Sequence, residues 1–118
     1  MAPGLLVAQH RSTGNGPTTI EGTGGELIIG VALVQAAEGY LASLYVDPTR
    51  QGTGAGGLLL SHCASLCRAA GSKHLRLWVF ETNTVARRFY ASSGATLTGR
   101  RRVEPQYGVT EVELCLPL

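Results

Sequence analysis

The stretch from Leu44 to Gly57 constrains the fold of this chain more than any other, because it joins an apolar run to a glycine-rich turn and then to a helix. It reads Leu-Tyr-Val-Asp-Pro-Thr-Arg-Gln-Gly-Thr-Gly-Ala-Gly-Gly. Apolar residues recur at helical spacing directly afterwards, which predicts a helix over Leu58–Ala70. A turn of glycines at a helix start exposes several backbone N–H groups at the positive end of the helix dipole. The stretch therefore predicts an anion site suited to phosphate.

The composition is that of one globular domain over residues 1–118. The net charge of +2 is too small to indicate nucleic acid or an anionic membrane as a partner. The N-terminus lacks the features of a signal peptide, and no run approaches the ~20 apolar residues of a membrane span. Cys63 and Cys67 share one helix face, but no second pair follows at zinc spacing, so we interpret them as core residues. We therefore expect a soluble, reduced, cytoplasmic protein without a bound metal.

Four segments are predicted ahead of the glycine turn. Leu5–His10 is a short apolar run that favours a strand. Residues 12–25 are polar, glycine-rich and without period, which favours a flexible connection. Glu26–Gln35 is dense in branched apolar residues, as in a buried strand. Tyr40–Val46 follows after a short turn, and we expect these two strands to form an antiparallel hairpin.

Beyond the first helix, His74–Phe80 alternates apolar and polar residues and is predicted to be a strand. Because a helix crossover precedes it, it should lie parallel to Tyr40–Val46. Asn83 is a suitable N-cap for a second helix that runs to Ser92. Two further strands are predicted, Thr96–Val103 and Val109–Leu116.

Gly52, Gly54 and Gly57 spell G-x-G-x-x-G, the dinucleotide-binding fingerprint. That fingerprint needs its first glycine directly after a strand, whereas residues 47–51 intervene here. The chain also has room for one clear crossover, and the strands ahead of the turn are predicted to be antiparallel. We therefore interpret the turn as a phosphate-binding turn of another kind.

Two segments of the chain resemble motifs of the GNAT superfamily of N-acetyltransferases. The acetyl-CoA signature of that family is Arg or Gln, two residues, Gly, one residue, then Gly or Ala, and Gln51, Gly54 and Gly56 occupy those places. The helix that flanks the coenzyme is matched by Asn83-x-x-Ala86-x-x-Phe89-Tyr90-x-x-x-Gly94-Ala95. The motifs stand in the family order, and the resemblance covers the chain from Glu26 to the C-terminus.

The resemblance implies an α/β (α+β) fold with a mixed, mostly antiparallel sheet that is splayed at its centre and carries two main helices. It implies acetyl-CoA as co-substrate, with pantetheine between Tyr40–Val46 and His74–Phe80 and the pyrophosphate on the glycine turn. The family's N-terminal strand and helices are largely missing, because only a short segment precedes Glu26. The coenzyme-binding residues that the resemblance implies are Leu44, Tyr45, Val46, Gln51, Gly52, Thr53, Gly54, Ala55, Gly56, Asn83, Arg87 and Tyr90.

The resemblance also implies catalytic roles. Tyr90 matches the tyrosine that protonates the leaving thiolate in many family members; the alternative is that it only packs on the coenzyme. A backbone N–H near Val46 would polarise the thioester carbonyl. The sequence does not identify the base; our first candidate is Glu81, at the end of the strand that borders the opening. Further candidates are Glu111, Glu113 and Tyr45.

Three polar features carry two interpretations each. Asn83 is expected both to cap its helix and to contact the coenzyme. Arg87 reaches a phosphate or lies on a solvated helix face. The run Arg100–Arg102 is a solvated edge, or it contacts a phosphate or an acidic substrate.

The predicted function is acetyl-CoA-dependent N-acetylation of a primary amine by direct attack in a ternary complex. The alternatives are a non-catalytic acetyl-CoA or CoA-binding module, or a truncated fragment of a longer acetyltransferase. The sequence does not name the acceptor, which is a small-molecule or peptide amine. Because the short N-terminus leaves a sheet face uncovered, we also expect a homodimer.

Overall fold

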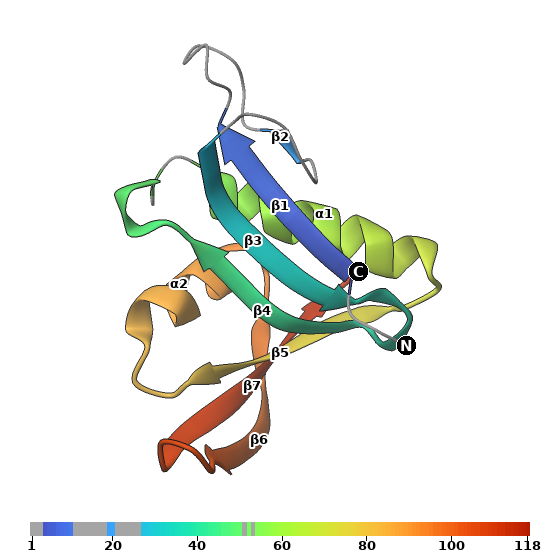
Figure 1. Cartoon of the computed structure of the whole chain (residues 1–118). Helices are drawn as coiled ribbons and strands as arrows, with labels where there is room; N and C mark the ends of the chain where they lie inside the picture. Colours follow the sequence, from blue (N-terminus) through green and yellow to red (C-terminus); the bar gives the residue numbers. More distant parts are fainter. Residues whose placement is uncertain (1–3, 11–18, 21–26, 51, 53) are drawn as a thin grey trace.

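The computed structural model describes residues 4–10, 19–20, 27–50, 52 and 54–118, which form one mixed sheet with two α-helices (Figure 1). The strand order is β2-β1-β3-β4-β5-β7-β6, and among these neighbours β4 and β5 are the parallel pair. The expected mixed, mostly antiparallel fold is thus confirmed. The elements are β1 Gly4–His10, β2 Thr19–Ile20, β3 Leu27–Gln35, the 3-10 turn η1 Ala36–Glu38, β4 Tyr40–Val46, the 3-10 turn η2 Pro48–Arg50, α1 Ala55–Ala69, β5 His74–Phe80, α2 Thr84–Ser92, β6 Thr96–Glu104 and β7 Val109–Pro117.

The first four strands form an antiparallel half of the sheet. β3 pairs with β1 on one side and with β4 on the other, which confirms the predicted hairpin. β2 falls within residues 12–25, where we expected only a flexible connection, and its two residues pair with β1. Thr and Ile favour strands, but the glycines around them obscure this signal in the sequence. The rest of that segment lies outside the described residues.

Helix α1 begins at Ala55, earlier than the predicted start at Leu58. Gly54 is its N-cap with a φ of 90°, and the Leu58 N–H donates to the Gly54 carbonyl at 3.0 Å. The prediction was late because glycine disfavours helices, whereas this helix carries two glycines in its first turn. Cys63 and Cys67 are buried, free thiols of the core, as the sequence indicates.

Both helices contribute to a core on one face of the sheet. Leu75, Leu77 and Val79 of β5 are buried in this core, whereas the alternate residue Arg76 is exposed. Figure 1 shows α1 lying along β1 and β3, and α2 lying where the ends of β4 and β5 diverge. We call the opposite side of the sheet the bare face, because no helix of the described part of the chain covers it.

In the described ranges, no helix is long and apolar enough to cross a membrane. Within the same ranges, no three His, Cys, Asp or Glu side chains gather closely enough to hold a metal ion.

Candidate active site

β4 and β5 diverge at the centre of the sheet. Their one registered pair is Tyr40 and Arg76, and the Arg76 N–H donates to the Gly39 carbonyl at 2.8 Å. Beyond this pair, the β4 edge that faces β5 has no further strand partner in the residues described. Backbone N–H and C=O groups need partners when water is excluded, so this edge is suited to pairing with a polar ligand. The splayed sheet that the sequence resemblance implies is therefore present.

A cavity of about 270 Å³, which we call the splay cavity, occupies this opening. Its walls come from β4, β5, α2 and β7, so that it lies in the place expected for the pantetheine arm. Its lining residues are Leu41, Ala42, Ser43, Leu44, Leu77, Trp78, Val79, Phe80, Asn83, Ala86, Tyr90 and Glu111.

The residues of β4 lie differently relative to the splay cavity. Leu44 lines it, whereas Val46 packs against the core and Tyr45 is 55% exposed. Ala42 and Ser43, which the sequence did not single out, also line the cavity. A register shift between β3 and β4 leaves Ala42 without a Cα partner, as in a β-bulge, and bulges re-aim the backbone next to functional sites. The local sequence carries no turn residue that marks this bulge.

Tyr90 belongs both to the core and to the wall of the splay cavity. The residue is 7% exposed, and its ring packs edge-on against Phe89 with the centroids 5.0 Å apart. Burial, with a smaller contribution from Cys63, raises the pKa of Tyr90 to about 12. No hydrogen bond joins its hydroxyl to any other residue that the structure describes. The phenol is thus protonated at neutral pH and can act as a hydrogen-bond donor.

The start of α2 is fixed by two polar side chains. Asn83 Oδ1 accepts a hydrogen bond from the Ala86 N–H at 3.1 Å, so that Asn83 is the predicted N-cap, and it also lines the splay cavity. Arg87 Nη1 donates to the Glu81 carbonyl at 2.9 Å. Arg87 therefore holds the turn ahead of the helix to the helix itself.

The glycine turn leads into the start of α1, where the first backbone N–H groups point out of the helix. Gly54 caps the helix through its backbone alone, since no side chain of the described residues accepts from the first-turn N–H groups. Gly56 lies against α2, because an added Cβ there would be 3.3 Å from the Phe89 ring. Helix α2 therefore both contacts the turn and lines the splay cavity. Gln51 and Thr53 lie outside the described residues, and Gly52 is exposed.

The carboxylate candidates occupy different surroundings. Glu81 accepts a hydrogen bond from Arg101 Nη2 at 3.1 Å and lines neither the splay cavity nor the pocket on the bare face. Glu111 lines the splay cavity and accepts from Arg102 Nε at 2.8 Å. The structure therefore brings Glu111, and not Glu81, to the same cavity as Tyr90.

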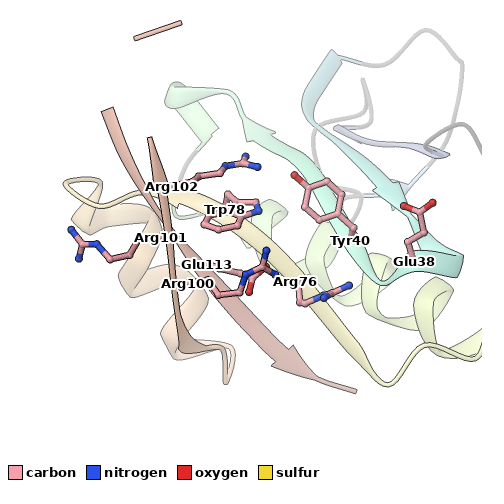
Figure 2. A pocket seen from close by; sticks show the side chains of 8 residues that line it. All are labelled: Glu38, Tyr40, Arg76, Trp78, Arg100, Arg101, Arg102 and Glu113. Carbon is pink, nitrogen blue, oxygen red and sulfur yellow. The ribbon is translucent and has the colours of Figure 1, made fainter. Parts of the chain in front are cut away.

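A second pocket of about 340 Å³ lies on the bare face (Figure 2). Trp78 is at its centre, with the Arg102 guanidinium carbon 4.3 Å and that of Arg100 5.6 Å from a ring centroid. Arg101 points away from them. We call this site the bare-face pocket. The alternation along β5 places Arg76 and Trp78 on one face, and this can be predicted from the sequence. That the arginines of β6 lie on the same face and near Trp78 depends on the register of β5, β7 and β6, which the sequence does not give.

Comparison with protein families accounts for these features. The model of the acetyltransferase (GNAT) family matches residues 8–95. The chain belongs to the GNAT acetyltransferase family. The matched range includes the glycine turn and α2, and it ends ahead of β6. Comparison with curated proteins finds no match.

Solved structures of similar proteins share this GNAT fold. The yncA protein of Salmonella typhimurium, solved with acetyl-CoA, is 24% identical with a TM-score of 0.65, over 78% of this chain and 59% of that chain. The ribosomal-protein-S18-alanine N-acetyltransferase from Escherichia coli is 19% identical with a TM-score of 0.66, over 96% of this chain and 93% of that chain. Nourseothricin acetyltransferase is 19% identical with a TM-score of 0.66, over 98% of this chain and 88% of that chain. This chain thus spans 59% of the length of yncA.

Proposed function

We propose that this GNAT domain is an acetyl-CoA-dependent N-acetyltransferase that moves an acetyl group to a primary amine by direct attack in a ternary complex. The observation that carries the proposal is Tyr90 in the wall of the splay cavity, buried and with no hydrogen-bond partner for its hydroxyl among the described residues. Beside it, the β4 edge beyond Tyr40 has no strand partner in the same part of the chain. The similar solved structures of nourseothricin acetyltransferase and the ribosomal-protein-S18-alanine N-acetyltransferase support the same activity.

The residues present fit acetyl-CoA at two places. The first-turn N–H groups of α1 and the positive end of its dipole suit a pyrophosphate. The open backbone of β4 around Ala42–Leu44 suits the amides of a pantetheine arm, which would pair with it as an added strand does. Acetyl-CoA supplies the thioester whose acetyl group is transferred.

The chain's groups assist each bond change. As the amine nitrogen bonds to the acetyl carbon and the C–S bond breaks, backbone N–H groups of β4 stabilise the negative charge on the carbonyl oxygen. The Tyr90 hydroxyl donates to the departing sulfur. A phenol with a pKa of about 12 is a weaker acid than a thiol of about 8.5, so Tyr90 acts mainly as a hydrogen-bond donor and gives a modest rate effect.

The proton that the amine loses needs an acceptor in the same cavity. We assign this role to Glu111, acting directly or through one water, because this residue lines the splay cavity with Tyr90. Arg102 Nε holds that carboxylate in place at 2.8 Å. Glu81 is less suited, because its carboxylate is paired with Arg101 away from the cavity.

Coenzyme binding is tested first by thermal stabilisation. Acetyl-CoA at 100 times its dissociation constant should raise the free energy of unfolding by about 2.7 kcal/mol, whereas NAD should have no effect. Transfer is then tested by release of free thiol from acetyl-CoA with a panel of primary amines. A protein that acetyl-CoA stabilises but that releases no thiol with any amine would be the non-catalytic CoA-binding module.

The assembly state is a separate proposal. Leu33 and Tyr45 are 37% and 55% exposed on neighbouring strands, and exposed apolar residues on a sheet often mark an interface. We propose a homodimer in the cytoplasm. Sedimentation velocity at a protein concentration on the order of tens of micromolar checks this proposal, and a purely monomeric profile would contradict it.

A further inference from the structure

The bare-face pocket adjoins the splay cavity, because Trp78 lines both. The two sites share one row of side chains across β5 and β7. In this row Trp78 is registered with Glu113 and Phe80 with Glu111. A molecule in the pocket can therefore extend past Trp78 toward the cavity that holds Tyr90.

Charge in this region is layered by depth. The Glu111 and Glu113 side chains are 10% and 6% exposed, whereas those of their partners Arg102 and Arg100 are 49% and 65% exposed. Glu113 also accepts from Thr98 Oγ1 at 2.9 Å. The buried carboxylates thus fix the arginines from below, and guanidinium groups form the layer that meets solvent.

Donors remain free in this outer layer. Each guanidinium carries five N–H donors, and a single carboxylate contact leaves most of them available. Arg76 lines the same pocket and has no carboxylate within ion-pair distance among the residues described. Glu38 lies on η1, at the other side of the pocket from Arg100 (Figure 2). The side of the pocket formed by β5 and β6 is therefore cationic.

We propose that Arg76 and the outward donors of Arg100 bind a carboxylate of the acceptor, whose primary amine reaches the splay cavity past Trp78. A planar guanidinium matches a carboxylate with two parallel hydrogen bonds. Arg76, which has no ion-pair partner in the described part of the chain, would match the negative charge of the carboxylate. The acceptor class is thus an amine with a carboxylate at its far end. This assignment of substrate class rests on the proposed acetyl transfer.

Strand geometry sets a minimum length for this acceptor. Arg76 and Trp78 are two residues apart on β5, which corresponds to about 7 Å along a strand. An extended peptide covers about 3.3–3.6 Å per residue, so the amine and the carboxylate should be separated by at least about two residues or an equivalent alkyl chain. Aminohexanoate is a simple probe of that length.

Trp78 is the chain's one tryptophan, and its fluorescence reports binding without turnover. We would titrate aminohexanoate, its uncharged amide and hexylamine, each with and without CoA. Aminohexanoate should give a saturable change with an affinity at least about tenfold above that of the amide, as expected for a charge-assisted contact. The variant Arg76→Gln should abolish this preference. Arg88→Gln, which removes an exposed charge on α2, should retain it.

Two results would overturn the carboxylate assignment. One is equal affinity for aminohexanoate and its amide, and the other is the absence of a saturable change with and without CoA. Acetyl-CoA binding is measured separately by thermal shift. Absence of that shift would contradict the proposed transfer function. A shift without a preference for the carboxylate would contradict only the proposed acceptor class.

Discussion

Tyr40 of β4 and Arg76 of β5 form the one registered pair that ties the two central strands together in the described chain, and both cavities lie beside this tie. Gly39 precedes Tyr40 with a φ of 62°, and its carbonyl accepts the Arg76 N–H. An added Cβ at Gly39 would collide with the His74 carbonyl oxygen. The splay thus depends on a glycine at its closed end.

Gly39→Ala should therefore destabilise the fold by more than the usual strain of a left-handed alanine, which is about 1–2 kcal/mol. The matched control is Gly71→Ala, where φ is 89° but an added Cβ meets no atom within 4 Å. Urea unfolding of both variants measures the difference. Equal losses would show that contact with β5 at Gly39 contributes nothing beyond backbone strain.

Gly54→Ala should weaken acetyl-CoA binding. Gly54 caps α1 at a φ of 90°, a conformation that is strained for alanine. If the backbone relaxes to relieve this strain, the first N–H groups of the helix no longer point in a common direction. We expect about a tenfold loss of affinity, which corresponds to about 1.4 kcal/mol. The affinity is measured by isothermal titration calorimetry.

Tyr90→Phe should lower the rate of thiol release by about 100-fold or less, the lower end of the range for a general acid. Acetyl-CoA affinity should be nearly unchanged, because the ring is kept. Stability should not fall, since the hydroxyl has no partner among the described residues. Tyr107→Phe is the control, because Tyr107 is an exposed residue. If Tyr90→Phe works at the native rate, Tyr90 only packs in the core.

The stability of the fold should decrease at alkaline pH. Burial raises the pKa of Tyr90 from 10.0 to about 12 and that of Cys63 from 9.0 to about 12. Both groups stay protonated in the fold after the unfolded chain has begun to lose its protons. Their contribution is therefore complete below the unfolded pKa values and is lost as pH rises through about 9–12.

Each pKa unit corresponds to about 1.4 kcal/mol, so Tyr90 alone should account for roughly 2–3 kcal/mol of this loss. Chemical unfolding at stepped pH measures it. In Tyr90→Phe the fall above pH ~10 should be shallower. A parallel fall in both proteins would mean that Tyr90 does not titrate with the fold.

The sequence was informative wherever structure is local. The Asn83 cap, the glycine turn and the strand order around the crossover follow from neighbours in the chain. The sequence was less informative where the pairing between strands determines which side chains meet. Glu81 stands at the end of β5 as expected, yet its partner Arg101 is set by the register of β6, which the sequence does not specify.

The bulge at Ala42 and the bare-face pocket illustrate the same limit. Nothing in Leu41–Leu44 marks the residue that leaves the ladder, although this determines which part of β4 lines the splay cavity. Arg100 and Trp78 meet only because β7 lies between β5 and β6. Such contacts depend on strand order and register together, so composition and spacing alone do not reveal them.

Glu111→Gln should reduce thiol release by about 100-fold, because an amide takes up no proton from the attacking amine. Glutamine keeps the shape and can still accept a hydrogen bond from Arg102 Nε, so the fold should remain. Glu81→Gln is the matched control, because it changes the same functional group outside the splay cavity. We would measure rates from pH ~7 to ~10, since raising the pH deprotonates the amine and should partly restore Glu111→Gln. A loss in Glu81→Gln with native rates in Glu111→Gln would return the role of the base to the residue at the end of β5.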